Sequence, residues 1–292
     1  MSTDKQVDFL CIGAAKAGTT WLHDMLSQHP GVARAKAKEI NYFNPQHPEY
    51  ADRPNPDAER AIDWYHAQFE GSAPAMLWGD YATAYLRYPA SAARVKAYRP
   101  DMKLIVLLRN PVERAISHHH FLYQWGVVPQ EDFMAAAQSH ENILQSGLYG
   151  EQLAGWMEHF PAEQFLILDY ARIAENPSAL WEEVLAFLGL PSFALPSQDK
   201  RSNASAGVKS KRLHRSIQWL RGGWQAVPGR AGMSRLLTRL GARRLLHRVY
   251  AANSGSGQSL PPISPATRDW LHTYYLPDQQ TLRDLIGWNH LG

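Results

Sequence analysis

Small residues and hydroxyl groups surround a lysine near the start of the chain, over residues 13–20. Lys16 supplies a cation, and the hydroxyls of Thr19 and Thr20 can donate hydrogen bonds. Where such a loop joins a strand to a helix, the N–H groups of the first helical turn attract anions. The loop differs from a Walker A loop, because Lys16 lies two residues before Gly18 rather than after the last glycine. The run therefore predicts a phosphate site, with a plain glycine-containing turn as the alternative.

A second candidate anion site follows the most apolar predicted strand, residues 102–108. Arg109 ends that strand, and Ser117 lies eight residues later, two turns into a predicted helix. At the carboxyl end of a parallel strand, such side chains face the ligand crevice. A guanidinium binds phosphate through two parallel hydrogen bonds, and a hydroxyl can add a third. The pair predicts a second phosphate site; an ordinary surface ion pair is the alternative for Arg109.

The elements that must position these motifs alternate between strands and helices. Apolar runs predict strands at 7–12, 102–108 and 165–170, and helical spacing predicts helices at 21–26, 59–70, 112–123, 180–188 and 266–286. Residues 44–60 are rich in Pro, Asn and Asp and predict a loop. Alternation of this kind favours an α/β fold, with a central parallel sheet between two layers of helices and a mostly helical C-terminal part.

Charge is distributed unevenly along the 292 residues, although the net charge is only +3. Residues 200–250 contain 13 Lys and Arg and no Asp or Glu. A segment this basic is expected to meet an anionic partner, such as an acidic glycan, an acyl carrier protein or a membrane surface. The alternative is a helical cover over the active-site cleft, or a solvated face balanced by acidic residues elsewhere.

Composition excludes several classes of protein. Apolar residues make up 45% and charged residues 20%, as in ordinary globular proteins rather than disordered or fibrous ones. The single cysteine, Cys11, excludes an internal disulfide and lies in an apolar run that predicts burial. No run of 18 apolar residues and no signal-peptide pattern is present, so the expected location is the cytoplasm.

Together the two phosphate motifs resemble those of the sulfotransferases that use 3′-phosphoadenosine 5′-phosphosulfate. The family's 5′-phosphosulfate loop is similar to residues 16–21, and its 3′-phosphate element to residues 108–117. Three further runs are similar to the heparan-sulfate-type branch of the family, at 38–43, 62–69 and 147–161. The resemblance covers about residues 7–215 and implies one domain over 1–292, with a core at 7–215 and a basic helical cover at 211–292.

The resemblance implies transfer of a sulfuryl group from that donor to a hydroxyl or amine of a carbohydrate, acyl chain or small metabolite. It assigns the leaving-group oxygen to Lys16 and the 3′-phosphate to Arg109 and Ser117. The implied ligands of the 5′-phosphate end are Lys16, Ala17, Gly18, Thr19, Thr20 and Trp21. A closing loop with Lys209 and Lys211 would cover the donor. Neither a metal nor a nucleic acid is expected.

The general base implied by the heparan-type branch is Glu39; a surface carboxylate paired with Lys36 or Lys38 is the alternative. The adjacent histidines at 118–120 offer a rival base, although their side chains diverge by about 100° on a helix. Contacts with the acceptor are implied for Asp80, His118 and Tyr149, with core packing as the alternative.

Two other functions remain open from the residues alone. A P-loop kinase or NTPase would use the same loop with magnesium and ATP. A non-catalytic module would bind nucleic acid through the basic segment, with an affinity that falls steeply as salt rises.

Overall fold

The computed structural model describes residues 5–48, 53–69, 73, 76–196, 207–208, 254–255 and 260–288. Contacts between residues group the chain into two compact units. The first unit comprises Met1–Ala115, Leu144–Asn203 and Arg268–Gly292, and the second comprises Ile116–Ile143 and Ala204–Thr267. Both units are therefore assembled from separated stretches of sequence.

A five-stranded parallel sheet forms the centre of the first unit, in the order β2-β3-β1-β4-β5. The strands are β1 (Phe9–Gly13), β2 (Val32–Ala33), β3 (Leu77–Tyr81), β4 (Lys103–Leu108) and β5 (Phe165–Asp169). The three predicted strands are confirmed as β1, β4 and β5. Strand β3 was not predicted from the sequence, because Gly79 and Asp80 interrupt its apolar pattern. The chain passes from β1 to β2 and β3 on one side, and then crosses to β4 and β5 on the other, which creates a switch point between β1 and β4 where ligands bind in such sheets.

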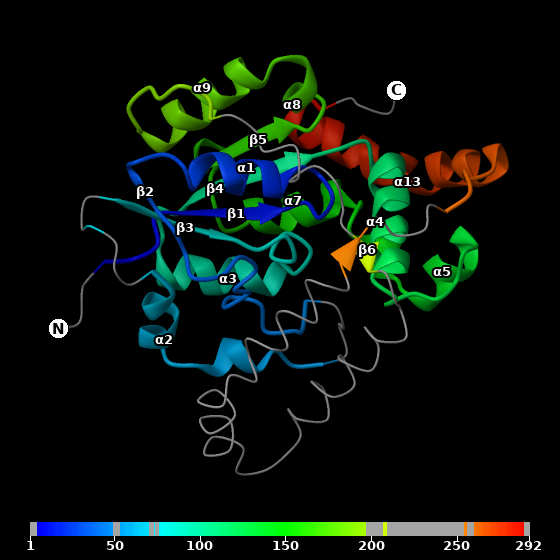
Figure 1. Cartoon of the computed structure of the whole chain (residues 1–292), viewed down its shortest axis with the longest axis horizontal. Helices are drawn as coiled ribbons and strands as arrows, with labels where there is room; N and C mark the ends of the chain where they lie inside the picture. Colours follow the sequence, from blue (N-terminus) through cyan, green and yellow to red (C-terminus); the bar gives the residue numbers. More distant parts are fainter. Residues whose placement is uncertain are drawn as a thin grey trace, which may run out of the picture. The chain divides into compact units, whose positions relative to one another are not determined.

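Helices cover both faces of this sheet, as the α/β pattern predicts. In Figure 1, α1 (Thr19–Leu26), α8 (Arg172–Glu175) and α9 (Pro177–Leu188) lie on one side. On the other side, α3 (Pro89–Tyr98) packs against α7 (Tyr149–Met157). The predicted helix at 59–70 is instead broken into three short pieces, η1 (Pro56–Glu59), α2 (Ile62–His66) and η2 (Ala67–Phe69).

The last helix, α13 (Pro265–Ile286), confirms the helix predicted at 266–286. Its Asp278 carboxylate accepts hydrogen bonds from the main-chain N–H groups of Gly150 and Glu151, at 3.0 and 2.9 Å. Its Tyr275 hydroxyl donates to the main-chain oxygen of Leu144 at 2.8 Å. Through the two Asp278 bonds α13 satisfies the open N-terminus of α7, which no side chain of α7's own segment caps among the described residues.

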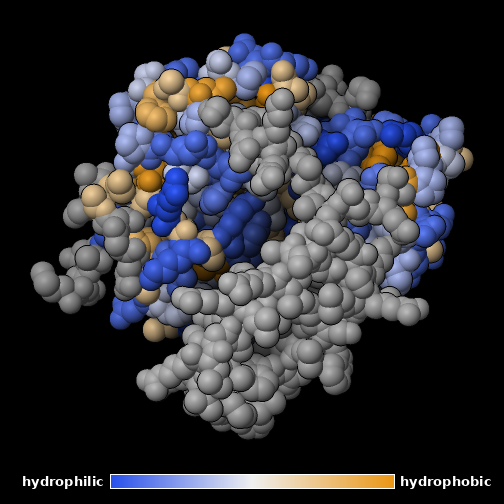
Figure 2. All heavy atoms as spheres, in the orientation of Figure 1, coloured by the Kyte–Doolittle hydropathy of each residue, from blue (hydrophilic) through white to orange (hydrophobic). Residues whose placement is uncertain are grey.

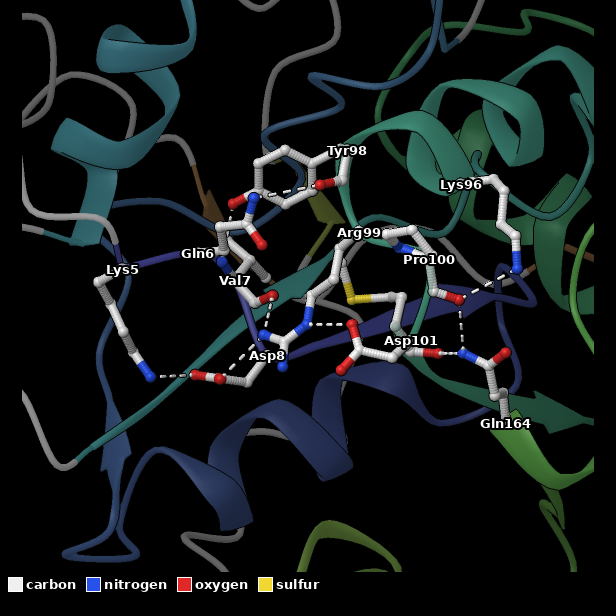
Figure 3. Close-up of polar contacts among 11 residues, drawn as sticks. Lys5, Gln6, Val7, Asp8, Lys96, Tyr98, Arg99, Pro100, Asp101 and Gln164 are labelled. Carbon is white, nitrogen blue, oxygen red and sulfur yellow. Dashed lines mark hydrogen bonds and ion pairs between the residues drawn. The ribbon is translucent and has the colours of Figure 1, made fainter.

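Apolar side chains of β1 and β4 fill the core, and Cys11 is buried among them as predicted. At the amino ends of the strands, Asp8 anchors a polar network (Figure 3). Its carboxylate accepts a hydrogen bond from Arg99 Nη1 at 3.0 Å and pairs with Lys5 at 2.8 Å. The same carboxylate also accepts a hydrogen bond from the main-chain N–H of Trp78 at 2.7 Å. The network joins β1 to β3 at the amino ends of the strands, whereas the phosphate motifs follow their carboxyl ends.

The second unit contains most of α4 (Pro111–Gln124), then α5 (Phe133–Ser139), and a short antiparallel pair of β6 (Gly207–Val208) and β7 (Ser254–Gly255). The basic helices predicted between 211 and 250 lie outside the described residues. One further short helix, α6 (Asn142–Gln145), precedes α7.

Hydrophilic residues dominate the described part of the face in Figure 2. Among the described residues, the large apolar side chains with the greatest exposure are Ile62, Trp270, Leu276 and Leu285. Within the described ranges, no helix is both long enough and apolar enough to cross a membrane.

Candidate active site

The loop between β1 and α1 requires a glycine at position 18. Gly18 has a φ of +93°, in the left-handed region. A Cβ atom there would lie 2.5 Å from Ile173 Cδ1 and 3.0 Å from Tyr170 Cδ2, so any side chain would also clash. Among the described residues, no side chain caps the first turn of α1, and that turn carries no acidic group. Its positive end therefore suits an anion.

Lys16 and Arg109 meet at the carboxyl ends of β1 and β4. Arg109 Nη1 donates a hydrogen bond to the main-chain oxygen of Lys16 at 3.2 Å. The Arg109 guanidinium stacks 4.7 Å from the centre of the Tyr170 ring. Burial, together with the nearby cations of Arg109 and Lys38, lowers the pKa of Lys16 to about 8. Such a concentration of positive charge suits a ligand with several negative charges.

Lys38 connects this loop to the segment that carries the predicted base. Its ammonium donates a hydrogen bond to Thr20 Oγ1 at 2.9 Å and lies 4.0 Å from Glu39 Oε1. Thr20 is exposed, whereas Thr19 and Trp21 beside it are buried. Sequence reasoning considered Lys38 only as an ion-pair partner; its position between the two segments comes from the fold.

Glu39 is held in place by the end of β3. Its main-chain N–H donates to Tyr81 O at 2.8 Å, and Glu39 Oε2 accepts from the main-chain N–H of Thr83 at 2.9 Å. The Glu39 side chain is 38% exposed, but the surrounding protein desolvates the carboxyl and raises its pKa to about 7. Lys38 and the Thr83 hydrogen bonds oppose that rise. A carboxyl that changes charge near neutral pH suits proton transfer.

Buried asparagines shape the loop that presents Glu39, and sequence reasoning missed them. Asn41 donates to Glu39 O at 2.9 Å, and Asn55 donates to Asn41 O at 2.7 Å and to Asn44 O at 2.9 Å. Ser91 of α3 closes the network by donating to Asn44 Oδ1 at 2.6 Å. Glu39 and Asn41 both have positive φ, at 59° and 56°, a conformation that needs such support. The polar Asn41 and Asn44 flanking aromatic residues were the available signal.

Two residues expected to touch the acceptor are instead fully buried. Asp80 has no exposed surface and accepts hydrogen bonds from the hydroxyls of Tyr65 and Tyr85. Tyr149 begins α7 and also has no exposed surface. Burial raises its pKa, while the nearby Arg114 cation lowers it. Core packing, the alternative stated for both side chains, is what the structure shows for Asp80 and Tyr149.

The remaining predicted positions lie in the second unit or outside the described residues. Ser117 and His118 belong to the part of α4 in the second unit, and His118 is buried. His119 is also buried, with Nε2 within 3.0 Å of Gln130 O, and burial lowers its pKa. Lys209 and Lys211 lie outside the described residues.

Comparison with known proteins identifies the family. A sulfotransferase domain model matches residues 6–205. The chain belongs to the sulfotransferase family. The resemblance to this family is thereby confirmed for most of the sulfotransferase chain, and the match ends within the first residues of the basic segment.

Relatives of this sulfotransferase include enzymes named for heparan sulfate. It is 28% identical over 210 residues to a bovine (Bos taurus) bifunctional heparan sulfate N-deacetylase/N-sulfotransferase 2, covering 65% of this chain and 23% of that protein. It is 30% identical over 190 residues to human (Homo sapiens) heparan sulfate glucosamine 3-O-sulfotransferase 6, covering 62% and 52%. The chain thus spans well under two thirds of these relatives' length.

A solved structure confirms the fold. The sulfotransferase from Alicyclobacillus acidocaldarius superposes with a TM-score of 0.67 at 22% identity, covering 98% of this chain and 97% of the other. The predicted α/β sulfotransferase architecture, with a parallel sheet between helical layers, is therefore correct.

Proposed function

We propose that this sulfotransferase moves a sulfuryl group from 3′-phosphoadenosine 5′-phosphosulfate to a hydroxyl or amine of a carbohydrate acceptor. The observation that carries the proposal is the convergence, at the carboxyl ends of β1, β4 and β3, of Lys16, Arg109 and the segment with Glu39. The heparan sulfate relatives support the carbohydrate class of acceptor.

The donor carries anions at both ends, and the site offers two anion partners. Residues 16–21 would hold the 5′-phosphosulfate end through the N-terminus of α1, whose first turn bears no acidic group among the described residues. Arg109 would bind the 3′-phosphate, because its guanidinium is already fixed by Tyr170 and the Lys16 main chain. Ser117, Lys209 and Lys211 remain sequence-based predictions for further contacts with the donor.

The donor supplies the sulfuryl group, whose S–O bond to phosphate breaks as the acceptor oxygen or nitrogen bonds to sulfur. Glu39 takes the proton released by the acceptor as that bond forms. Lys16 donates a hydrogen bond to the phosphate oxygen that leaves, where negative charge accumulates. Lys38, between Thr20 and Glu39, keeps the two segments at the spacing that the transfer needs.

Calorimetric titration with adenosine 3′,5′-bisphosphate tests the donor site, with 5′-AMP and ATP as competitors and no added magnesium. We expect selective binding of the bisphosphate, because only this nucleotide presents both phosphate ends. Equal or tighter binding of ATP would contradict the proposal and favour a kinase-like enzyme. Nucleotide affinity that is unchanged in Arg109→Ala and falls steeply as salt rises would favour a non-catalytic nucleic-acid module.

Transfer of labelled sulfate to a panel of desulfated glycans tests the reaction and the base. Glu39→Gln keeps the size of the side chain but cannot accept a proton, so we expect bisphosphate affinity to persist and turnover to fall by about a hundredfold or more. Near-normal turnover of Glu39→Gln would remove Glu39 from the mechanism.

A further inference from the structure

Asp80 is a buried carboxyl that the proposed mechanism does not use. It lies on β3, next to Tyr81, whose main-chain oxygen accepts the hydrogen bond of the Glu39 N–H. Asp80 is the fourth residue of β3 and has no exposed surface. Its Oδ2 accepts hydrogen bonds from the hydroxyls of Tyr85 at 2.8 Å and Tyr65 at 3.0 Å. Its Oδ1 is buried and has no hydrogen-bond partner among the described residues. A carboxyl in such a place is costly for the fold and calls for a role.

Two connections join Asp80 to the candidate base. The residue after it, Tyr81, accepts the main-chain hydrogen bond of Glu39 at 2.8 Å, so the same strand holds both carboxyls. Tyr85, which donates to Asp80, also accepts a hydrogen bond from the main-chain N–H of Phe43 at 3.4 Å. Phe43 ends the segment that begins at Lys38. The Asp80 carboxylate therefore fixes the orientation of a hydroxyl that supports the Glu39 segment.

We propose that Asp80 is a positioning residue that supports the Glu39 segment through Tyr85 and strengthens Glu39 as a base through its negative charge. This inference rests on the proposed function, since it assumes that Glu39 takes the proton. It assigns a role to the one carboxyl that faces Glu39 from β3, and it requires no direct contact between Asp80 and the substrate.

The electrostatics of the site support this reading. Burial raises the pKa of Asp80 to about 6, against the hydrogen bonds from Tyr85 and Tyr65. Burial raises the pKa of Glu39 to about 7, and the Asp80 charge adds to that rise. The two carboxyls therefore titrate in overlapping ranges and influence each other.

The other groups that face Glu39 come from three elements. Lys38 on its own segment and the Thr83 hydrogen bonds after β3 favour its charged form. Cys11 of β1 and Tyr85 are also electrostatically coupled to Glu39, but burial raises the pKa of each, so both stay neutral near pH 7. Asp80 is therefore the negative charge whose removal should change the proton affinity of Glu39.

The test is the pH profile of kcat/KM for Asp80→Asn. Asparagine keeps the shape of the side chain and can still accept the tyrosine hydrogen bonds, but it carries no charge. We expect the acid limb of the profile to move to lower pH by about half a unit, because Glu39 loses a neighbouring negative charge. Because Asp80 itself takes up a proton near pH 6, the difference between the variant and the wild type should be clearest between about pH 6 and 7.

Matched variants separate this role from simple structural support. Asp278→Asn neutralises another partly buried carboxyl, far along the chain on α13, and should leave the acid limb in place. Tyr65→Phe removes one hydrogen bond to Asp80 and keeps the ring, so Asp80 is less ionised and the limb should move in the same direction by a smaller amount. If Asp80→Asn does not fold, as judged by circular dichroism, Tyr65→Phe carries the test.

The outcomes distinguish the inference from the function on which it rests. If Glu39→Gln retains turnover, Glu39 is not the base, and the result contradicts the proposed function rather than the role of Asp80 alone. If Glu39→Gln is inactive while folded Asp80→Asn and Tyr65→Phe keep the wild-type limb within about 0.2 pH units, the role of Asp80 is overturned. A limb that moves to higher pH would also contradict it.

Discussion

Arg109 Nη1 donates a hydrogen bond to the main-chain oxygen of Lys16, which joins the two phosphate motifs across 93 residues of sequence. The guanidinium is held from its other side by the ring of Tyr170, at 4.7 Å. The same tyrosine ring packs against the position where a Gly18 side chain would start. One aromatic residue after β5 thus supports both halves of the candidate donor site.

Replacement of Arg109 by lysine should weaken donor binding although it preserves the charge. Lysine lacks the planar fork and the flat surface that stacks on Tyr170. We expect the affinity for adenosine 3′,5′-bisphosphate to fall by about tenfold to a hundredfold in calorimetry. Arg60→Lys, at an exposed arginine paired with Asp57, is the control and should bind normally. Unchanged affinity of Arg109→Lys would argue against a bidentate phosphate contact.

Substitution of Gly18 by alanine should damage both stability and binding. The change places a Cβ in a left-handed backbone and 2.5 Å from Ile173 Cδ1, so the loop must shift. We expect a loss of about 1–3 kcal/mol in the free energy of unfolding and a large loss of bisphosphate affinity.

Gly189→Ala is the matched control for that loop. Gly189 ends α9 with a φ of +73°, but a Cβ there would meet nothing closer than Lys103 Nζ at 4.0 Å. We expect about 1 kcal/mol of destabilisation with bisphosphate binding intact. Equal losses of binding in the two variants would show that the Gly18 effect is general destabilisation.

The dependence of kcat/KM for the donor on pH should be a narrow bell. Activity rises with pH through about 7, where Glu39 loses its proton, and falls above about 8, where Lys16 loses its charge. Lys16→Arg keeps a positive charge at all working pH values, so its alkaline limb should disappear even if its rate is lower. Persistence of that limb in Lys16→Arg would assign it to another group.

Loss of the Asp278 carboxylate should destabilise the protein through α7. Asp278→Ala leaves the N–H groups of Gly150 and Glu151 without their acceptor, which should cost about 1–2 kcal/mol in urea denaturation. Asp284→Ala, on the same helix, removes only an exposed contact with Gln280 and serves as the control. An equal effect of the two substitutions would mean that the capping bonds contribute little.

Local patterns in the sequence determined much of the architecture. The apolar runs at 102–108 and 165–170, the helix at 266–286 and the glycine loop around Lys16 all depend on residues close together in the chain, so spacing alone predicts them. Neighbouring apolar runs likewise placed Cys11 in the core. Each of the two phosphate motifs consists of neighbouring residues, so the sequence alone indicates the family.

Only the tertiary structure decided the surroundings of the reactive groups. Glu39 takes its hydrogen bonds from Thr83, 44 residues away, and Asp80 is buried by tyrosines on either side of it in sequence rather than presented to an acceptor. The contact between Arg109 and Tyr170 likewise could not be predicted from the sequence. Proton affinity depends on lost water and on nearby charges, and both are set by which distant segments pack together. A residue type can therefore suggest a catalytic group, but packing determines what that group can do.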